Sequence, residues 1–135
     1  AIKEKAFGVD NPGLVPTLDE AALFYQAQGK YAEAEPLYRR ALAINEKAFG
    51  ASDAQVAKSL DRLADLCRKE SKFGEAESLY KRALAIDEKI YGPNHREVAA
   101  LLENYAVLLH QMGREQEAAP LEARARAIRS NSAGN

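Results

Sequence analysis

The chain has 135 residues and a mass of 14.8 kDa, which suits one domain with its own hydrophobic core. It carries 19 Lys and Arg against 20 Asp and Glu, so it lacks the positive charge with which proteins bind nucleic acids or anionic membranes. No stretch is apolar enough to span a bilayer, and the single cysteine, Cys67, excludes an internal disulfide. We therefore expect no nucleic-acid partner and no membrane partner.

A sequence motif returns every 42 residues. It begins at Ala1 (AIKEKAFG), Ala43 (AINEKAFG), Ala85 (AIDEKIYG) and Ala127 (AIRSNSAG). The two complete units, 31–72 and 73–114, share 18 of their 42 positions. Alanine occurs 26 times, whereas Val, Ile and Thr together occur 11 times, which favours helices over strands. The repeat predicts an all-α array of stacked helix pairs.

The spacing of the apolar residues predicts six helices. The expected ranges are 16–29, 31–48, 53–70, 73–90, 95–112 and 115–129. Beyond the first turn of a helix, proline removes a backbone hydrogen bond and clashes with the carbonyl four residues back. Pro16 therefore predicts a first helix that starts near Val15 or Pro16, with 10–14 as a loop or a single turn; a longer, kinked helix is the alternative. The last six residues, SNSAGN, are expected to fray.

The helix ends also carry signals. SDAQ and NHRE have the form of a capping box, with Ser52 and Asn94 as the expected N-caps. Gly29 and Gly113 suit the left-handed residue that ends many helices, and Ser71 departs from this pattern.

One apolar stripe lies inside the second unit. It comprises Val56, Leu60, Leu63, Ala64 and Cys67, which recur at the spacing of one helix face. The stripe predicts the buried side of the helix and favours a core role for Cys67 over a nucleophilic one.

The run QGKYAEAEPLYRRAL resembles a tetratricopeptide repeat (TPR). The family's signature positions are occupied by Gly29, Tyr31, Ala34, Tyr38 and Ala41. The 42-residue period and the GPNHREVA junction resemble the kinesin light chain type, whereas Ala21, Ser71 and Pro16 depart from the family pattern. The resemblance implies an α-α superhelix, a TPR solenoid of about three helix-turn-helix repeats. The whole chain is then a single array, with 1–8 as the tail of a preceding repeat and 9–50, 51–92 and 93–135 as repeats.

The two ends of this array differ. The last unit has Glu115, Glu122 and Arg126 where the earlier units have aromatic residues or leucine, which is typical of a terminal capping helix. Ordinary repeat degeneracy, with further repeats beyond 135, is the alternative. The opening tail predicts a fragment of a longer array. Ile2, Phe7 and Leu23 are then left uncovered, and we expect self-association through the N-terminal end.

The sequence contains no motif that indicates catalysis. It has no Gly-rich phosphate loop and no GxSxG elbow, and its two histidines, His95 and His110, form no HExxH arrangement. His95 is expected to cap a helix. Nearby carboxylates such as Asp61 and Asp65 fit a solvated helix face better than acid–base work. We therefore expect no enzyme, no cofactor and no metal site.

In TPR arrays the first helices of successive units line a concave groove, and the resemblance carries that role onto this chain. The candidate partner-binding residues are Asp19, Glu20, Leu23, Lys58, Arg62, Asp65, Arg68, Lys69, Glu103, Asn104, Val107 and His110. The wider groove set adds Pro16, Gln26, Ala27, Asp61, Ala100 and Gln111. Their spacing independently places each set on one helix face, opposite the apolar stripe.

These features predict a non-enzymatic interaction module that binds a peptide or partner protein in the groove. The groove side of the middle helix carries four cations and only two carboxylates. We therefore expect a ligand with a short acidic segment flanked by apolar or basic residues. Lys58 and Arg62 resemble a clamp for a C-terminal carboxylate, but Glu20 stands where that clamp needs asparagine. The resemblance implies a cytoplasmic location. The alternative is a self-associating or regulatory segment of a larger multidomain protein.

Overall fold

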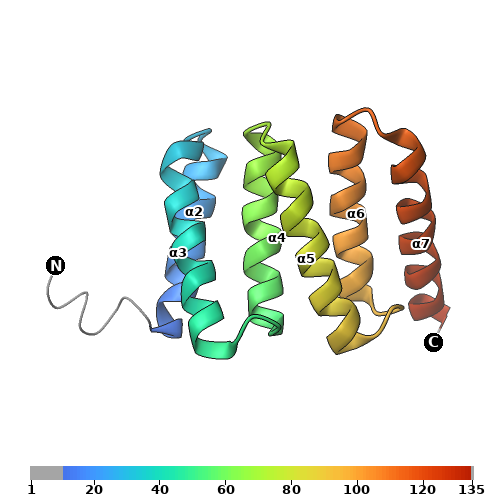
Figure 1. Ribbon diagram of the computed structural model, residues 1–135, viewed down its shortest axis with the longest axis horizontal. Helices are drawn as coiled ribbons and strands as arrows, with labels where there is room; N and C mark the ends of the chain where they lie inside the picture. The colour runs from blue at the N-terminus through green and yellow to red at the C-terminus, as the bar shows by residue number, and fades with distance from the viewer. Residues whose placement is uncertain (1–10, 135) are drawn as a thin grey trace, which may run out of the picture.

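A computed structural model describes residues 11–134. A short 3-10 helix, η1 (Pro12–Leu14), leads into α2 (Val15–Ala27). The chain then forms α3 (Tyr31–Phe49), α4 (Ala54–Lys69), α5 (Phe73–Tyr91), α6 (Arg96–Gln111) and α7 (Glu115–Gly134). Figure 1 shows α2–α3, α4–α5 and α6–α7 as helix pairs standing in a row from the N-terminus to the C-terminus. The all-α fold and the six expected helices are confirmed, while Ile2, Phe7 and the 1–8 tail lie outside the described residues.

The first long helix starts where Pro16 predicts. α2 begins at Val15 with Pro16 in its first turn, where a missing backbone N–H costs nothing. Before it, η1 is a single turn capped by Asn11, whose Oδ1 accepts a hydrogen bond from the Gly13 backbone N–H at 2.8 Å. The expectation of a late start is correct, and a longer, kinked helix is not formed.

The N-caps of α4 and α6 lie one residue later than the capping-box pattern indicates. Asp53 Oδ1 accepts a hydrogen bond from the Gln55 N–H at 2.8 Å, and His95 Nδ1 accepts one from the Glu97 N–H at 3.0 Å. Asp53 and His95 have the extended backbone that turns a side chain toward the first helical turn. The assignment of Ser52 and Asn94 as caps is therefore wrong, and the expected capping role of His95 is confirmed.

The turns inside the three helix pairs share one backbone geometry. The residues at their tips, Gly29, Ser71 and Gly113, have φ angles of 76°, 64° and 75°. In each turn the next backbone N–H donates to the carbonyl five residues back, at 2.8 Å in all three cases. Ser71 therefore departs from the pattern in side chain only, because its backbone adopts the same left-handed conformation as the glycines.

Small residues let the helices of the array approach closely. Ala34, Ala76 and Ala118, and likewise Ala41, Ala83 and Ala125, lie 42 residues apart in each series, and all six are buried. The predicted stripe of α4 is confirmed, since each of its five residues is completely buried. Burial raises the pKa of the Cys67 thiol to about 12, which agrees with a core role.

The first helix pair leaves large apolar side chains exposed. Phe24 is 62% exposed, whereas its counterparts in the next units, Leu66 and Leu108, are fully buried. Leu23 is also exposed, as predicted. At the other end α7 continues to Gly134, the last described residue, so residues 130–134 are helical where fraying is expected.

We expect Ser71→Gly to raise the free energy of unfolding. A residue with a Cβ in the left-handed conformation costs about 1 kcal/mol, and glycine removes most of that cost. Urea denaturation monitored by circular dichroism measures the change. The matched control, Gly113→Ser, introduces the same strain in the next turn and should lower the stability by a similar amount. A less stable Ser71→Gly protein would contradict the argument.

Candidate functional site

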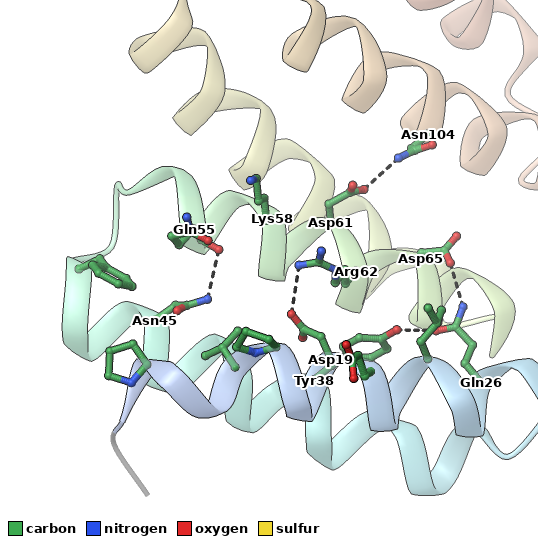
Figure 2. A pocket seen from close by; sticks show the side chains of 16 residues that line it. Asp19, Gln26, Tyr38, Asn45, Gln55, Lys58, Asp61, Arg62, Asp65 and Asn104 are labelled. Carbon is green, nitrogen blue, oxygen red and sulfur yellow. Dashed lines mark hydrogen bonds and ion pairs between the residues drawn. The ribbon is translucent and has the colours of Figure 1, made fainter. Parts of the chain in front are cut away.

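A pocket of about 740 Å³ lies between α2 and α4 (Figure 2). Seven of the twelve candidate residues line it: Asp19, Glu20, Leu23, Lys58, Arg62, Asp65 and Asn104. Pro16, Gln26 and Asp61 of the wider groove set line it as well. This volume falls within the range of clefts that bury small ligands, roughly 300 to 1,000 Å³.

Polar contacts tie the first helices of the three pairs together. Arg62 Nη1 lies 3.1 Å from Asp19 Oδ2, which joins α4 to α2. Asn104 Nδ2 donates to Asp61 Oδ1 at 3.0 Å, which joins α6 to α4. Arg68 Nη1 makes a second α4–α6 contact with Gln111 Oε1 at 2.8 Å. Each of these contacts spans 43 residues, and the Asp19–Arg62 link recurs one repeat later as Asp61–Asn104.

Sequence inspection did not assign six further lining residues to the site. These are Pro12, Val15, Tyr38, Asn45, Phe49 and Gln55. Tyr38 belongs to the buried face of α3, but its hydroxyl reaches the pocket and donates to Gln26 Oε1 at 3.1 Å. Asn45 follows it by seven residues and is buried, with its Nδ2 2.9 Å from Ser59 Oγ. A polar residue on an otherwise apolar stripe is the sequence signal that marks Asn45.

The cations expected to dominate the groove are largely neutralised. Arg62 pairs with Asp19, and Arg68 contacts Asp65 at 2.7 Å. Lys69 lies 3.6 Å from the same Asp65 carboxylate. Among the described residues, Lys58 has no ion-pair partner.

The pocket wall itself is more acidic than basic. It contains the carboxylates of Asp19, Glu20, Asp61 and Asp65 against the cations Lys58 and Arg62. The expected local excess of positive charge is therefore absent from the pocket, because Arg68 and Lys69 lie outside it and α2 adds two carboxylates to its wall.

The pKa values of the pocket carboxylates are shifted in different directions. Burial raises the pKa of Asp19, and the Arg62 charge opposes this rise. It also raises the pKa of Asp61, where the Asn104 hydrogen bond opposes it. At Asp65 burial acts in the same direction, but the hydrogen bonds from Arg68 and Gln26 outweigh it and lower the pKa. Asp65 is thus well compensated, whereas Asp19 and Asp61 keep part of their desolvation cost.

The three candidate residues near the C-terminal end lie outside the pocket. Glu103 accepts hydrogen bonds from Arg129 of α7, at 2.7 and 2.8 Å. The ring nitrogens of His110 contact Glu122, at 3.0 Å, and Glu115, and these two carboxylates raise the pKa of the imidazole. Val107 is exposed and available for apolar contact.

The described part of the chain shows neither a metal-binding cluster nor a membrane-spanning helix. Within residues 11–134, no group of three or more His, Cys, Asp and Glu side chains is arranged to hold a metal ion. None of the helices in this part of the chain is long and apolar enough to cross a membrane.

Stacked helix pairs with a 42-residue period define an α-solenoid repeat protein. A family model described as Tetratricopeptide repeat matches residues 13–89 and 55–131. The chain belongs to the tetratricopeptide repeat family, and the predicted resemblance is confirmed. No curated protein matches the sequence.

Solved structures share this architecture. BtubC (BKLC) from P. vanneervenii has a TM-score of 0.88 at 21% identity, over 98% of this chain and 53% of that protein. A kinesin light chain-like protein of Podosopora anserina with nearly identical TPR-like repeats has a TM-score of 0.82 at 25% identity, over 91% of this chain and 58% of that protein. MamA MSR-1 C2 has a TM-score of 0.66 at 24% identity, over 96% of this chain and 64% of that protein. The chain therefore spans between about half and two thirds of these proteins.

Asp87 is the counterpart of the pocket residue Asn45 in the next unit. Asn45 donates to Ser59, but the residue that corresponds to Ser59 is Leu101, which offers no hydrogen bond. Burial, reinforced by the charges of Glu97 and Asp61, raises the pKa of Asp87 to about 6. Above this pH the ionised carboxylate therefore destabilises the folded state.

We expect Asp87→Asn to stabilise the protein at pH 7.5 by up to about 3 kcal/mol, since the pKa rises from 3.8 to about 6 and each pKa unit corresponds to about 1.4 kcal/mol. The gain should shrink as the pH falls from about 6 to 4, because Asp87 is then already protonated in the folded state. Urea denaturation at several pH values measures it. The mirror variant, Asn45→Asp, should lose stability at pH 7.5. A gain that does not depend on pH would contradict a titrating Asp87.

Proposed function

We propose that this chain is a non-enzymatic interaction module that binds a peptide or partner protein along α2, α4 and α6. The pocket between α2 and α4, which gathers seven of the twelve candidate residues, carries this proposal. Tetratricopeptide repeats generally mediate protein–protein interactions, and the family is typically non-catalytic. Helix-lined grooves bind extended or helical segments through side-chain pockets.

The binding surface extends from the pocket across the three first helices. Its proposed members are Asp19, Glu20, Leu23, Lys58, Arg62, Asp65, Arg68, Lys69, Glu103, Asn104, Val107 and His110. Leu23 and Val107 supply exposed apolar contacts on either side of the charged centre. Asn104 supplies a carbonyl oxygen for a ligand N–H, since its amide N–H₂ is already directed to Asp61.

An acidic segment of the ligand fits the outer rim of α4. Lys58 has no ion-pair partner among the described residues, and Lys69 makes a single contact at 3.6 Å. The two lysines lie eleven residues apart on one helix face, about 16 Å along the axis. About five residues of extended peptide cover that distance. We therefore place the acidic residues of the ligand over Lys58 and Lys69.

From the family resemblance we also propose a cytoplasmic location for the protein.

Peptides selected from a phage-displayed random dodecamer library on the immobilised chain provide the test. We expect micromolar dissociation constants by fluorescence polarisation, weakening as salt screens the charges. Lys58→Glu combined with Lys69→Glu should weaken binding by about tenfold or more, because both contacts become repulsive.

The matched control makes the same charge change on α5, which contributes no residue to the pocket. Lys81→Glu combined with Lys89→Glu alters exposed residues of α5 and should leave the dissociation constant unchanged. Equal weakening by both double variants would show a general charge effect and contradict groove binding.

The exposed Phe24 favours a second candidate function, self-association through the N-terminal end, as in a regulatory segment of a larger multidomain protein. The equivalent leucines of the next two units are covered by the preceding helix pair, whereas Phe24 is 62% exposed. Exposed apolar surfaces of this kind promote association.

We expect Phe24→Ser to lower the apparent mass at high protein concentration in sedimentation velocity experiments, because it removes the apolar contact. Val107→Ser, which removes an exposed apolar side chain elsewhere, serves as the control. A wild-type chain that stays monomeric across the concentration series would exclude this function and leave the groove proposal intact.

A further inference from the structure

The charges of the α2–α4 pocket are unevenly compensated. Asp19 has Arg62 as its partner, and Asp65 is contacted by Arg68 and Gln26. Asp61 receives only the neutral amide of Asn104, at 3.0 Å. Within the described part of the chain it has no cationic partner within ion-pair distance. One partly buried carboxylate on the pocket wall is therefore left with a single neutral donor.

Lys58 does not fill this role. It lies one turn before Asp61 on the same helix and lines the same pocket, yet the two side chains form no ion pair. Figure 2 shows the Asp61 carboxylate turned toward Asn104 of α6, with Lys58 beside it on α4 and no interaction drawn between the two. The second oxygen of Asp61 is thus available to a donor from outside the chain.

The rest of the lining suits a long side chain with a charged tip. Pro16 and Leu23 of α2 and Phe49 of α3 contribute apolar surface. An aliphatic stem can pack on such surface while its cationic head reaches a carboxylate. A purely apolar side chain would leave Asp61 without a compensating charge, and an acidic side chain would be repelled.

We propose that the α2–α4 pocket receives a lysine or arginine side chain of the bound peptide, with Asp61 as its ion partner. This inference rests on the proposed groove function and names the residue class that the pocket selects. The basic residue lies inside the pocket, and the acidic segment of the same ligand runs along α4, over Lys58 on the pocket wall and Lys69 outside the pocket. The groove therefore selects a peptide in which a basic residue adjoins an acidic segment.

Two small probes separate charge from shape. Nα-acetyl-arginine amide carries the guanidinium, and Nα-acetyl-citrulline amide is its neutral isostere. Both are titrated into the isotopically labelled protein and followed by amide chemical shifts. We expect the arginine probe to shift resonances of residues 15–26 and 55–65, and the citrulline probe to leave them unchanged. Equal shifts from both probes, or shifts elsewhere on the protein, would overturn the inference.

Variants test the assigned ion partner. Asp61→Asn keeps the hydrogen bond with Asn104 and should weaken binding of the arginine probe about tenfold. Glu33→Gln removes an exposed carboxylate of α3 that does not line the pocket, and it should leave the affinity unchanged. Lys58→Met removes a like charge from the pocket and should strengthen binding. A probe affinity unaffected by Asp61→Asn would overturn the assignment.

The peptides selected from the library distinguish this inference from the groove function. Peptides that contain a basic residue and bind less tightly to Asp61→Asn support the inference. Peptides weakened by Lys58→Glu and Lys69→Glu but insensitive to Asp61→Asn would overturn it while leaving groove binding supported. If no peptide responds to the lysine variants, the groove function fails, whatever the arginine probe shows.

Discussion

The close approach of neighbouring helices depends on alanines placed 42 residues apart. Ala34, Ala76 and Ala118 are fully buried, so each second helix lies directly against its neighbours. α3 packs on both α2 and α4 and thereby fixes the separation of these two first helices. Because the pocket lies between α2 and α4, its width is set by α3, whose Tyr38 and Asn45 also line it. A larger residue at Ala34 would change the core and the site together.

The helices were predictable from sequence because their signals are local. Apolar periodicity, Pro16 and the turn glycines each act within a few residues, and the helices formed where they indicated. The N-caps were displaced by one residue because each site offers two adjacent polar residues, and only the backbone angles select Asp53 and His95. The exact position of an N-cap therefore depends on backbone angles, which the residue types alone do not determine.

The charge of the site was not predictable in the same way. Arg62 and Asp19 lie 43 residues apart in the sequence, and their pairing appears only when α2 and α4 are side by side. Counting the four cations of α4 as one set predicts a positive excess at the middle of the groove, but Arg68 and Lys69 lie outside the pocket. His110 similarly belongs to the predicted groove face, but its contacts with Glu115 and Glu122 become visible only once α7 is in place.

The pocket is lined mainly by two neighbouring repeat units, and Asn104 of the third unit adds one side chain. Stability in such arrays is approximately a sum of terms for the single units and terms for the interfaces between neighbours, so one pair can detach without unfolding the others. Detachment of α2 and α3 from α4 would separate Asp19 from Arg62 and open the pocket completely. A ligand that contacts both α2 and α4 binds only the docked arrangement and adds its own free energy to that interface. Occupancy of the groove and rigidity of the N-terminal half of the array are therefore thermodynamically linked.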